Sequence, residues 1–458
     1  MALDSSVVAE RSSLSNLLRG KLSAAKSRVQ TTRGSDSIPS AWQIYDFVTG
    51  AIQRNQAHPA QFDAMFITSR TLEHTLGKGQ IVERSFSPLA RILPLESVRV
   101  SIDSVARAAK AFQANSAEIE VQVSRLINQA ARVVRPYLVD DSTIGALRGH
   151  MERGIPDVLQ ARMLGREWIS TGQLQVLFTS PWYVPSVMGV IAAFNEAGLP
   201  TIDLQHGQQG PFQSMYVGWE PSRFNGISLL PNQFWVWGEV TKERISPEGR
   251  CDNPMVKVVG YPFLRDAKQF SLASETYRST ETSPRIKPRV LVALQGSHLD
   301  LEGLLPAQLR EFMHRSHATF HLRPHPNYPL SRRTLKELGQ EFGSNVQVVS
   351  CEGALSLSIS TYDLLLTGFS SSALEAASMG IMSLLWAPVA KDQYPALVSS
   401  GVFTVDPDLT TSLEEVLGKR KNVNWESVEP YISSDPKLLD LAVEQLNLFE
   451  RINQGRRN

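Results

Sequence analysis

The stretch LQVLFTSPWYVPSVMGVIAAFNEAGLPTIDLQHG, residues 174–207, contains the pattern that decides the fold. Two short apolar runs, 174–180 and 201–207, flank a segment at 184–200 whose apolar residues recur with helical spacing. A glycine and a proline end that segment. The stretch therefore predicts a β-α-β unit, which in a parallel sheet brings the carboxyl ends of both strands to one edge.

The same alternation continues along the chain and predicts an α/β fold with two doubly wound, Rossmann-like domains that face each other. Further strands are expected at 62–69, 98–103, 233–239, 256–262, 289–297, 319–326 and 346–350, further helices at 104–135, 141–171, 301–316 and 330–343, and a strand–turn–helix–strand unit at 362–386. The predicted order is an N-terminal polar and basic segment at 1–40, a first domain at 41–265, a crossing between domains at 266–287, and a second domain with C-terminal helices at 288–458.

Composition narrows the class of protein. The chain has 458 residues, a net charge of +1 and 42% hydrophobic residues, which is ordinary for a globular protein and does not suggest nucleic-acid binding. Its two cysteines, Cys251 and Cys351, form no CxxC pattern, which argues against a disulfide framework and structural zinc. No apolar run approaches the ~20 residues that span a bilayer, and the N-terminus lacks the apolar core of a secretory signal. We therefore expect a cytoplasmic protein.

The N-terminal segment has several interpretations. Its leucines at positions 14, 17, 18 and 22 lie on one side of a possible helix that also carries Arg and Lys. A mobile tail, a helix on an anionic membrane surface or on a partner, and a helix packed on the protein itself all agree with this pattern. Peripheral contact with the inner membrane or with an assembly complex therefore stays open.

Three serines follow a predicted strand of the second domain. The run TGFSSSALEA, 367–376, leads from the strand into a helix, and a helix N-terminus offers free N–H groups and a positive dipole end. Ser370, Ser371 and Ser372 add hydroxyl groups, so we expect a phosphate site here. Simple capping of the helix is the alternative. Glu375 either interacts with the helix dipole or accepts hydrogen bonds from a ribose.

Two further strand ends of this domain carry polar residues. In RPHP, 323–326, two prolines stiffen the segment that holds Arg323 and His325. Arginine offers a fork of donors to phosphate, and histidine offers a donor or a proton. Gly296 and Ser297 end another strand and are predicted to bind the nucleotide as well.

The first domain presents His206 at the matching position. It follows a strand, precedes a glycine, and is a candidate general base for an alcohol; a turn histidine bonded to backbone is the alternative. Glu239, at another strand end, is a second catalytic candidate or a solvated surface residue. The amides of Gln205 and Gln209 suit sugar hydroxyls, and the aromatic rings of Tyr183 and Trp219 are predicted to line the acceptor side, although Tyr183 is equally compatible with a core position.

Several common motifs are absent from the sequence. It contains no GxxxxGK[ST] loop and no GxGxxG after a strand, so neither a P-loop nor a dinucleotide-binding site is indicated. It also contains no HExxH motif and no promising DxD pair, so we expect no required metal and no cofactor.

The motifs LQHG, RPHP and TGFSSSALEAASMG together carry a family likeness over about residues 174–390. They resemble GT-B-fold glycosyltransferases of bacterial surface-polysaccharide assembly. The HP and serine-rich motifs are similar to those of transferases that use CMP-activated sugars, such as bacterial sialyltransferases and β-Kdo transferases. The HG and HP motifs are also similar to those of CDP-glycerol glycerophosphotransferases.

This resemblance implies roles for particular positions. His325 and the three serines would hold the donor phosphate, Glu375 would lie near the ribose, and His206 would face the acceptor or the reacting sugar carbon. The acidic base motif of the sialyltransferases has no clear counterpart here. The candidates for the base or nucleophile are therefore His206, Glu239 and, less favoured, Asp203 and Glu220.

The expected function is a metal-independent GT-B glycosyltransferase. Its donor would be a nucleotide sugar, first a CMP-linked acidic sugar such as Kdo or a sialic-acid-like sugar, and its acceptor a lipid-linked or cell-surface glycan of capsule, O-antigen or lipopolysaccharide synthesis. A CDP-polyol phosphotransferase, a nucleotide-sugar epimerase and a non-catalytic glycan-assembly protein are the alternatives. The epimerase would need more carboxylates near the cleft than the sequence places there.

Overall fold

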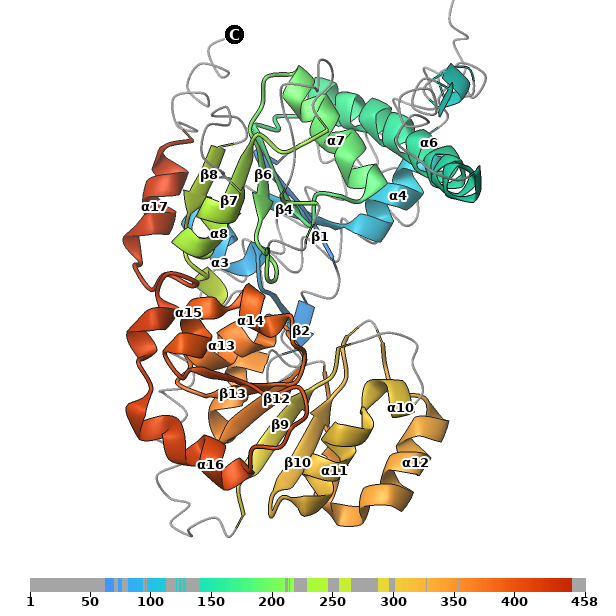
Figure 1. Ribbon diagram of the computed structural model, residues 1–458. Coiled ribbons are helices and arrows are strands. Elements are labelled where there is room, and N and C mark those ends of the chain that lie inside the picture. Colours follow the sequence, from blue (N-terminus) through green and yellow to red (C-terminus); the bar gives the residue numbers. More distant parts are fainter. Residues whose placement is uncertain are drawn as a thin grey trace, which may run out of the picture.

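The computed structural model has two lobes, each built on a parallel sheet covered by helices (Figure 1). The two-domain α/β architecture expected from the sequence is thus confirmed. The structure describes residues 62–69, 73–75, 81–93, 95, 97–112, 121, 123–125, 127–128, 141–210, 213, 215–217, 229–245, 255–264, 287–295, 301–326, 328–351 and 355–446. The predicted N-terminal segment and nearly all of the predicted crossing lie outside these residues.

The first sheet has six parallel strands in the order β4-β1-β5-β6-β7-β8. Buried apolar residues fill most strand positions because helices cover both faces. The strands are β1 (Ala64–Thr68), β4 (Ser97–Ser101), β5 (Val176–Ser180), β6 (Thr201–Leu204), β7 (Gln233–Val236) and β8 (Met255–Val258). A separate antiparallel hairpin pairs β2 (Glu73–Thr75) with β3 (Ile81–Glu83).

Helices from distant parts of the chain cover this sheet. The helices α4 (Ile102–Ala111), α6 (Asp141–Thr171) and α7 (Pro185–Glu196) pack on one face. The other face carries α3 (Phe86–Ile92) and the C-terminal helix α17 (Lys437–Glu444), whose Leu439 and Val443 join the core around Phe66. The sequence assigned the C-terminal helices to the second domain, but α17 returns to the first sheet (Figure 1).

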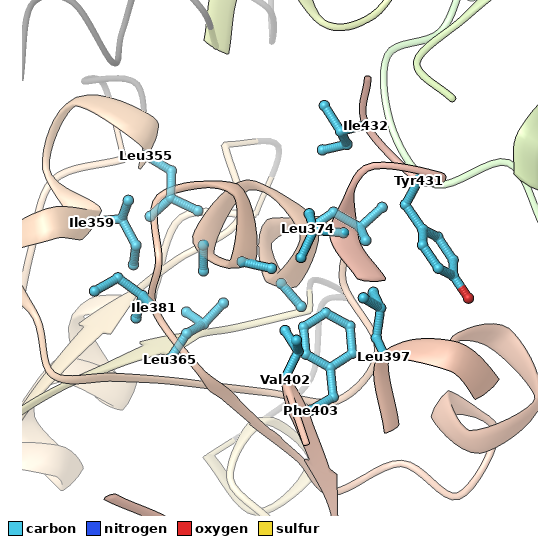
Figure 2. Packing of buried hydrophobic residues seen from close by; sticks show 14 of the residues in the cluster. Leu355, Ile359, Leu365, Leu374, Ile381, Leu397, Val402, Phe403, Tyr431 and Ile432 are labelled. Carbon is cyan, nitrogen blue, oxygen red and sulfur yellow. The ribbon is translucent and has the colours of Figure 1, made fainter. Parts of the chain in front are cut away.

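The second sheet repeats the design, with strand order β11-β10-β9-β12-β13-β14 and all neighbours parallel. One apolar face packs under helix α13 (Ser372–Ser378), where Leu365 and Leu374 lie in the same cluster as Ile432 (Figure 2). The strands are β9 (Arg289–Ala293), β10 (Thr319–Arg323), β11 (Val346–Val348), β12 (Leu364–Thr367), β13 (Ser383–Leu385) and β14 (Phe403–Val405).

The remaining helices complete the layers. The opposite face of the second sheet packs against α11 (Ala307–Arg315) and α12 (Arg332–Phe342). The other helices are α8 (Glu239–Ile245), α10 (Leu301–Leu304), α14 (Ala390–Gln393), α15 (Pro395–Ser399) and α16 (Leu413–Gly418), and the 3-10 turns are η5 (Gly343–Asn345), η6 (Leu355–Leu357), η7 (Ile359–Thr361), η8 (Lys419–Asn422) and η9 (Trp425–Val428).

Most predicted strands and helices occur close to their expected positions. The helix expected at 301–316 is divided into α10 and α11, because Pro306 cannot continue the hydrogen-bond ladder of α10 and instead caps α11. The helix expected from residue 104 begins at Ile102 and ends at Ala111. The sequence did not predict the β2–β3 hairpin, β14 or helix α3, and it predicted the C-terminal helices without giving their bounds.

The two lobes meet through backbone contacts as well as side chains. Val240 N–H donates to Pro430 carbonyl at 2.9 Å, and Ser433 N–H donates to Trp237 carbonyl at 2.8 Å. Gly238 lies in this contact, and a Cβ added there would be 2.3 Å from the Pro430 oxygen. A side chain at position 238 would therefore force the lobes apart.

Candidate functional site

The candidate site lies where loops from the strand ends of the two sheets approach each other. A Cβ placed on Gly207, after β6, would lie 3.6 Å from Ser371 Oγ at the start of α13. A Cβ on Gly210 would lie 3.0 Å from Gln393 Nε2 of α14. The carboxyl ends of parallel strands are the usual place for ligands in such sheets. The loop after β6 and the start of α13 lie next to each other here, and we call the boundary between the lobes at this point the cleft.

His206 lies in this cleft and is half-buried. The centroid of its ring is 6.3 Å from that of Tyr183, and its Nδ1 atom is buried without a hydrogen-bond partner. Burial, and next the positive charge of Arg84, lower the pKa of His206 to about 4. The imidazole is therefore neutral at pH 7, although the backbone of Leu204 acts on its pKa in the opposite direction, and Nδ1 makes no hydrogen bond of normal geometry.

The amide of Gln205 is used within the protein. Its Oε1 accepts from Trp237 N–H at 2.7 Å, and its Nε2 donates to Gly207 carbonyl at 2.9 Å. The side chain is buried. The prediction that Gln205 binds a sugar is therefore replaced by a structural role: it holds the loop that carries His206 against the next strand end.

Gln208 and Gln209 are also buried, but their amide groups are less completely hydrogen-bonded than that of Gln205. The Oε1 atom of Gln208 has no partner. Neither amide atom of Gln209 makes a hydrogen bond of normal geometry, and its polar neighbour is the phenol of Tyr216. Buried polar groups are nearly always satisfied, so the unpartnered Oε1 of Gln208, two residues from His206, is an atom whose hydrogen bonding a ligand or water would complete.

Asp203 belongs to a buried network below His206. It accepts from Tyr216 Oη at 3.1 Å and from Thr179 Oγ1 at 3.2 Å. Burial raises its pKa well above the ordinary value, although these two hydrogen bonds act in the opposite direction. Asp203 therefore supports the loop from beneath and is not presented to the cleft as a base.

Glu239 lies apart from the groups around His206. Its carboxylate forms an exposed ion pair with Lys242 at 3.0 Å in the first turn of α8. It also lines a separate cavity of about 1020 Å³, whose walls include Trp425 and Ile432. A solvated strand-end residue, the alternative stated from the sequence, describes this position better than a catalytic one. Trp219, Glu220, Gly296 and Ser297 lie outside the described residues.

Arg323 and His325 end β10 as expected. The guanidinium of Arg323 donates to the carbonyls of Ser350 and Cys351, at 3.1 and 3.2 Å, so its orientation is held by the next strand end. The ring of His325 lies against that of Tyr328, with centroids 5.3 Å apart. Burial, and next Arg84, lower the pKa of His325. Its neutral form is thus favoured.

The three serines have distinct environments. Ser370 Oγ accepts from Ser372 N–H at 3.2 Å and lies 3.0 Å from Ser372 Oγ, so Ser370 caps the helix. Phe369 N–H donates to Gln295 Oε1 at 2.8 Å. Ser371 makes no capping bond and faces Gly207. Capping therefore does occur, and the hydroxyl left for a ligand is that of Ser371.

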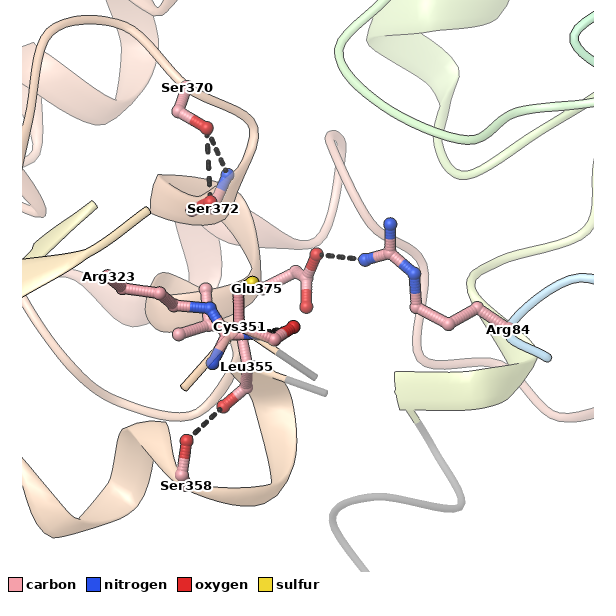
Figure 3. Close-up of polar contacts among 8 residues, drawn as sticks. All are labelled: Arg84, Arg323, Cys351, Leu355, Ser358, Ser370, Ser372 and Glu375. Atoms are coloured by element: carbon pink, nitrogen blue, oxygen red, sulfur yellow. Dashed lines mark hydrogen bonds and ion pairs between the residues drawn. The ribbon is translucent and has the colours of Figure 1, made fainter. Parts of the chain in front are cut away.

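Glu375 contacts a residue that the sequence did not suggest. Its Oε1 lies 2.8 Å from Nη1 of Arg84, which follows β3 in the first lobe (Figure 3). Glu375 is buried, and its Oε2 has no partner. Arg84 also influences the pKa values of His206, His325 and Arg323, which identifies it as the central charge of the cleft.

Arg84 could not be recognised from local pattern. It stands in IVERSFSPL, outside the β-α-β repeats, and its partner is 291 residues away. The one local signal is its neighbour Glu83, whose Oε2 accepts from Ser85 and Phe86 N–H groups at the start of α3. This capping arrangement fixes the turn and thereby directs Arg84 towards the second lobe.

The described part of the chain contains neither a metal-binding cluster nor a membrane-spanning helix. Among these residues, no group of three or more His, Cys, Asp or Glu side chains is arranged to hold a metal ion. No helix in the same residues has the length and apolarity needed to cross a membrane.

Comparisons with known proteins establish the fold. No protein-family model matches the chain, and no curated protein matches it either. The structure is similar to UDP-N-acetylglucosamine 2-epimerase from Rickettsia bellii, with a TM-score of 0.50, 12% identity and coverage of 87% of this chain and 99% of that one. Weaker likenesses are to S. aureus MnaA with UDP (TM-score 0.49, 12% identity, 86% and 97% covered) and Acinetobacter baumannii MurG (0.39, 11%, 85% and 99%). The chain therefore has a two-lobed, GT-B-like α/β fold.

Proposed function

We propose that this chain is an enzyme that acts on a nucleotide-activated sugar in the cleft between its lobes. One observation carries the proposal: Arg84 and His206 of the first lobe and Arg323 and Glu375 of the second lobe lie close enough to shift one another's pKa values or to form an ion pair where the two lobes meet. Donors for a phosphate and an acceptor for a hydroxyl proton are the two requirements for transfer of a sugar from a nucleotide.

In this proposal the second lobe binds the phosphate end of the donor. Arg323 is held in place by two carbonyl groups, and Ser371 offers a hydroxyl with no internal role. Guanidinium groups form charge-assisted bonds with phosphate and would stabilise the charge that develops on the leaving group. We propose that they do so without a metal, so that EDTA leaves the activity unchanged.

The first lobe would bind the group that receives the sugar. His206 is neutral at pH 7 because of its low pKa, so Nδ1 can accept a hydrogen bond or a proton from an acceptor hydroxyl. Tyr183 supplies an aromatic face beside it. A lipid-linked or cell-surface glycan remains our proposal for the acceptor, on the strength of the motif resemblance.

Epimerisation of a nucleotide sugar is the second candidate, and the likeness of fold to the Rickettsia epimerase favours it. An epimerase needs acid and base groups at the sugar carbon. Glu375 is paired with Arg84, and Asp203 is bonded to Tyr216 and Thr179. This occupancy of the carboxylates is our reason for placing transfer first.

The identity of the nucleotide in the donor is a separate question. None of the comparisons supports the predicted likeness to CMP-sugar transferases, and the solved structures include one with UDP. A UDP-linked sugar is therefore our first proposal for the donor. A CMP-linked acidic sugar and CDP-glycerol remain alternatives for the same phosphate site.

The experiment is to incubate the purified protein with UDP-N-acetylglucosamine, a CMP-sugar or CDP-glycerol, in D2O and with or without EDTA. Slow release of one nucleotide, without deuterium at C2 of the remaining sugar, is the result expected for transfer to water. Deuterium at C2 together with the C2 epimer would establish the second candidate instead. If none of the donors binds or turns over, both reaction classes are wrong and a non-catalytic role gains support.

A further inference from the structure

The Arg84–Glu375 ion pair joins the two lobes across the cleft. Arg84 belongs to the turn before α3, and Glu375 to α13 (Figure 3). The side chains are 17% and 4% exposed, and the bond is 2.8 Å long. Removing two charges from water is costly, and a buried pair repays that cost only when its other polar atoms are also satisfied.

Two other polar atoms of this pair are not satisfied. Arg84 Nε, a donor, and Glu375 Oε2, an acceptor, are both buried without a partner. A buried group left in this state destabilises the protein. Tyr261 also hydrogen-bonds to the Arg84 side chain, but Nε of Arg84 still lacks an acceptor and Oε2 of Glu375 a donor.

Besides the pair itself, the surroundings contain one cation, Arg323, one carboxyl group, Glu83, and two histidines whose lowered pKa favours the neutral form. From the first lobe, Glu83, Tyr261 and His206 face Arg84; from the second lobe, Arg323 and His325 face it together with Glu375. Burial alone would lower the pKa of Arg84, but Tyr261, Glu375 and Glu83 outweigh it and raise that pKa above its ordinary value. Glu83 is buried, and its pKa is raised to about 7.

We infer that Arg84 and Glu375 form a ligand-binding pair, and that a ligand carrying a phosphate beside a hydroxyl replaces the bond between them. The phosphate accepts from Arg84 and the hydroxyl donates to Glu375, so that both unpartnered atoms gain partners. Arg84 is then the phosphate-binding residue that the first lobe contributes to the site. This inference rests on the proposed function, because it refines the ligand of the same cleft.

A phosphate alone would be a poorer ligand for this pair. It would occupy Arg84 but leave Glu375 buried, charged and close to another anion. A nucleoside diphosphate brings phosphate oxygens and ribose hydroxyls together and satisfies both side chains. The pair therefore favours nucleoside diphosphates over inorganic pyrophosphate, and Glu375 carries the discrimination.

Replacement of the Arg84–Glu375 bond by a ligand would also change the charge that acts on His206. Arg84 is the second cause, after burial, of the low pKa of this histidine. An anion placed on Arg84 offsets its positive charge at the ring. The pKa of His206 is then expected to rise when the donor binds, which makes the imidazole a stronger base only in the loaded enzyme.

The test is calorimetric titration of the full chain with UDP and with inorganic pyrophosphate. We expect Arg84→Met to weaken UDP binding by roughly 10–100-fold, the loss of a charge-assisted bond, and Arg84→Lys to weaken it less. Glu375→Gln should strengthen pyrophosphate binding and reduce the preference for UDP over pyrophosphate. Arg162→Met, which breaks an ion pair with Glu196 between α6 and α7, is the matched control and should change neither affinity.

Three outcomes decide the matter, once thermal unfolding has shown that each variant is folded. Equal UDP affinity in the wild type and in Arg84→Met would overturn the inference. So would a Glu375→Gln protein in which pyrophosphate binding does not improve. If the wild type binds pyrophosphate but none of UDP, CMP and CDP, the proposed function fails. In that case, stronger pyrophosphate binding by Glu375→Gln would still support displacement of the ion pair by an anion.

Discussion

The strand-end loops of the two lobes occupy equivalent positions but differ in how their polar groups are satisfied. In the second lobe, Arg323 is held by two backbone carbonyls, Ser370 caps α13, and Gln295 accepts from Phe369 N–H. All of these bonds are made within the lobe itself. The second lobe therefore presents a rigid surface whose donors already point in fixed directions.

The first lobe is the opposite case. Gln205 alone among the predicted ligand-binding residues of its loop is fully bonded, whereas Nδ1 of His206 and Oε1 of Gln208 are buried without partners. Unmade bonds at buried atoms cost stability, and proteins retain such costs mainly at functional sites. The difference indicates that the second lobe is preorganised for the donor and that the first lobe is completed by what it binds.

Substitution of His206 gives the most direct test of this difference between the lobes. We expect His206→Ala to reduce turnover by ~10²–10⁴-fold while the protein stays folded and donor affinity changes little. Because the pKa of His206 is about 4, kcat/KM of the wild type should fall only as the pH drops through about 4, not near the ordinary value of 6.5. Steady-state rates of nucleotide release measure both effects. Near-normal turnover would return His206 to a structural role.

Glu83, whose Oε1 is buried without a partner, allows the loss of stability caused by such groups in the first lobe to be measured. Burial raises its pKa from 4.5 to about 7, so between these pH values the unfolded chain has lost a proton that the folded protein keeps. Stability should thus fall as the pH rises from about 4.5 to 7, by on the order of 3 kcal/mol from this group. Glu83→Gln should remove that loss. Denaturant unfolding at pH 5 and pH 8 compares the two, and identical pH slopes would contradict the assignment.

Two neighbouring glutamines offer a matched pair. Gln205→Met leaves Trp237 N–H buried without an acceptor and should destabilise the protein by about 1–3 kcal/mol. Gln208→Met removes an oxygen that has no partner and should be neutral or stabilising. Urea unfolding of both variants is the measurement. Equal losses of stability in the two variants would mean that Oε1 of Gln208 is as well bonded as Oε1 of Gln205, and that the first lobe is no less satisfied than the second.

The smallest expected effect is at His325. Its pKa is lowered, so at pH 7 it would offer phosphate a neutral hydrogen bond of about 0.5–1.5 kcal/mol and not a charge-assisted one. His325→Ala should then weaken UDP binding a few-fold at pH 7, and more at pH 5, where the wild-type imidazole is more often protonated. Titrations at the two pH values check the trend. A loss of the same size at both would show that the charge of His325 plays no part.

The sequence by itself determined the repeating architecture. Apolar runs and helical spacing are local properties, so nearly every strand and helix of both sheets could be placed, and with them the loops that hold His206, Arg323 and the serines. It also located polar residues at the correct edge of each sheet, because parallel strands bring their carboxyl ends together.

Only the tertiary structure decided which of these side chains remain available. The pairing of Arg84 with Glu375, the engagement of Gln205 by Trp237, and the position of Glu239 at a separate cavity all depend on contacts between distant segments. The return of α17 to the first sheet is of the same kind. No local period records such partners, because they arise when two independently formed layers pack and their buried polar groups compete for the same donors and acceptors.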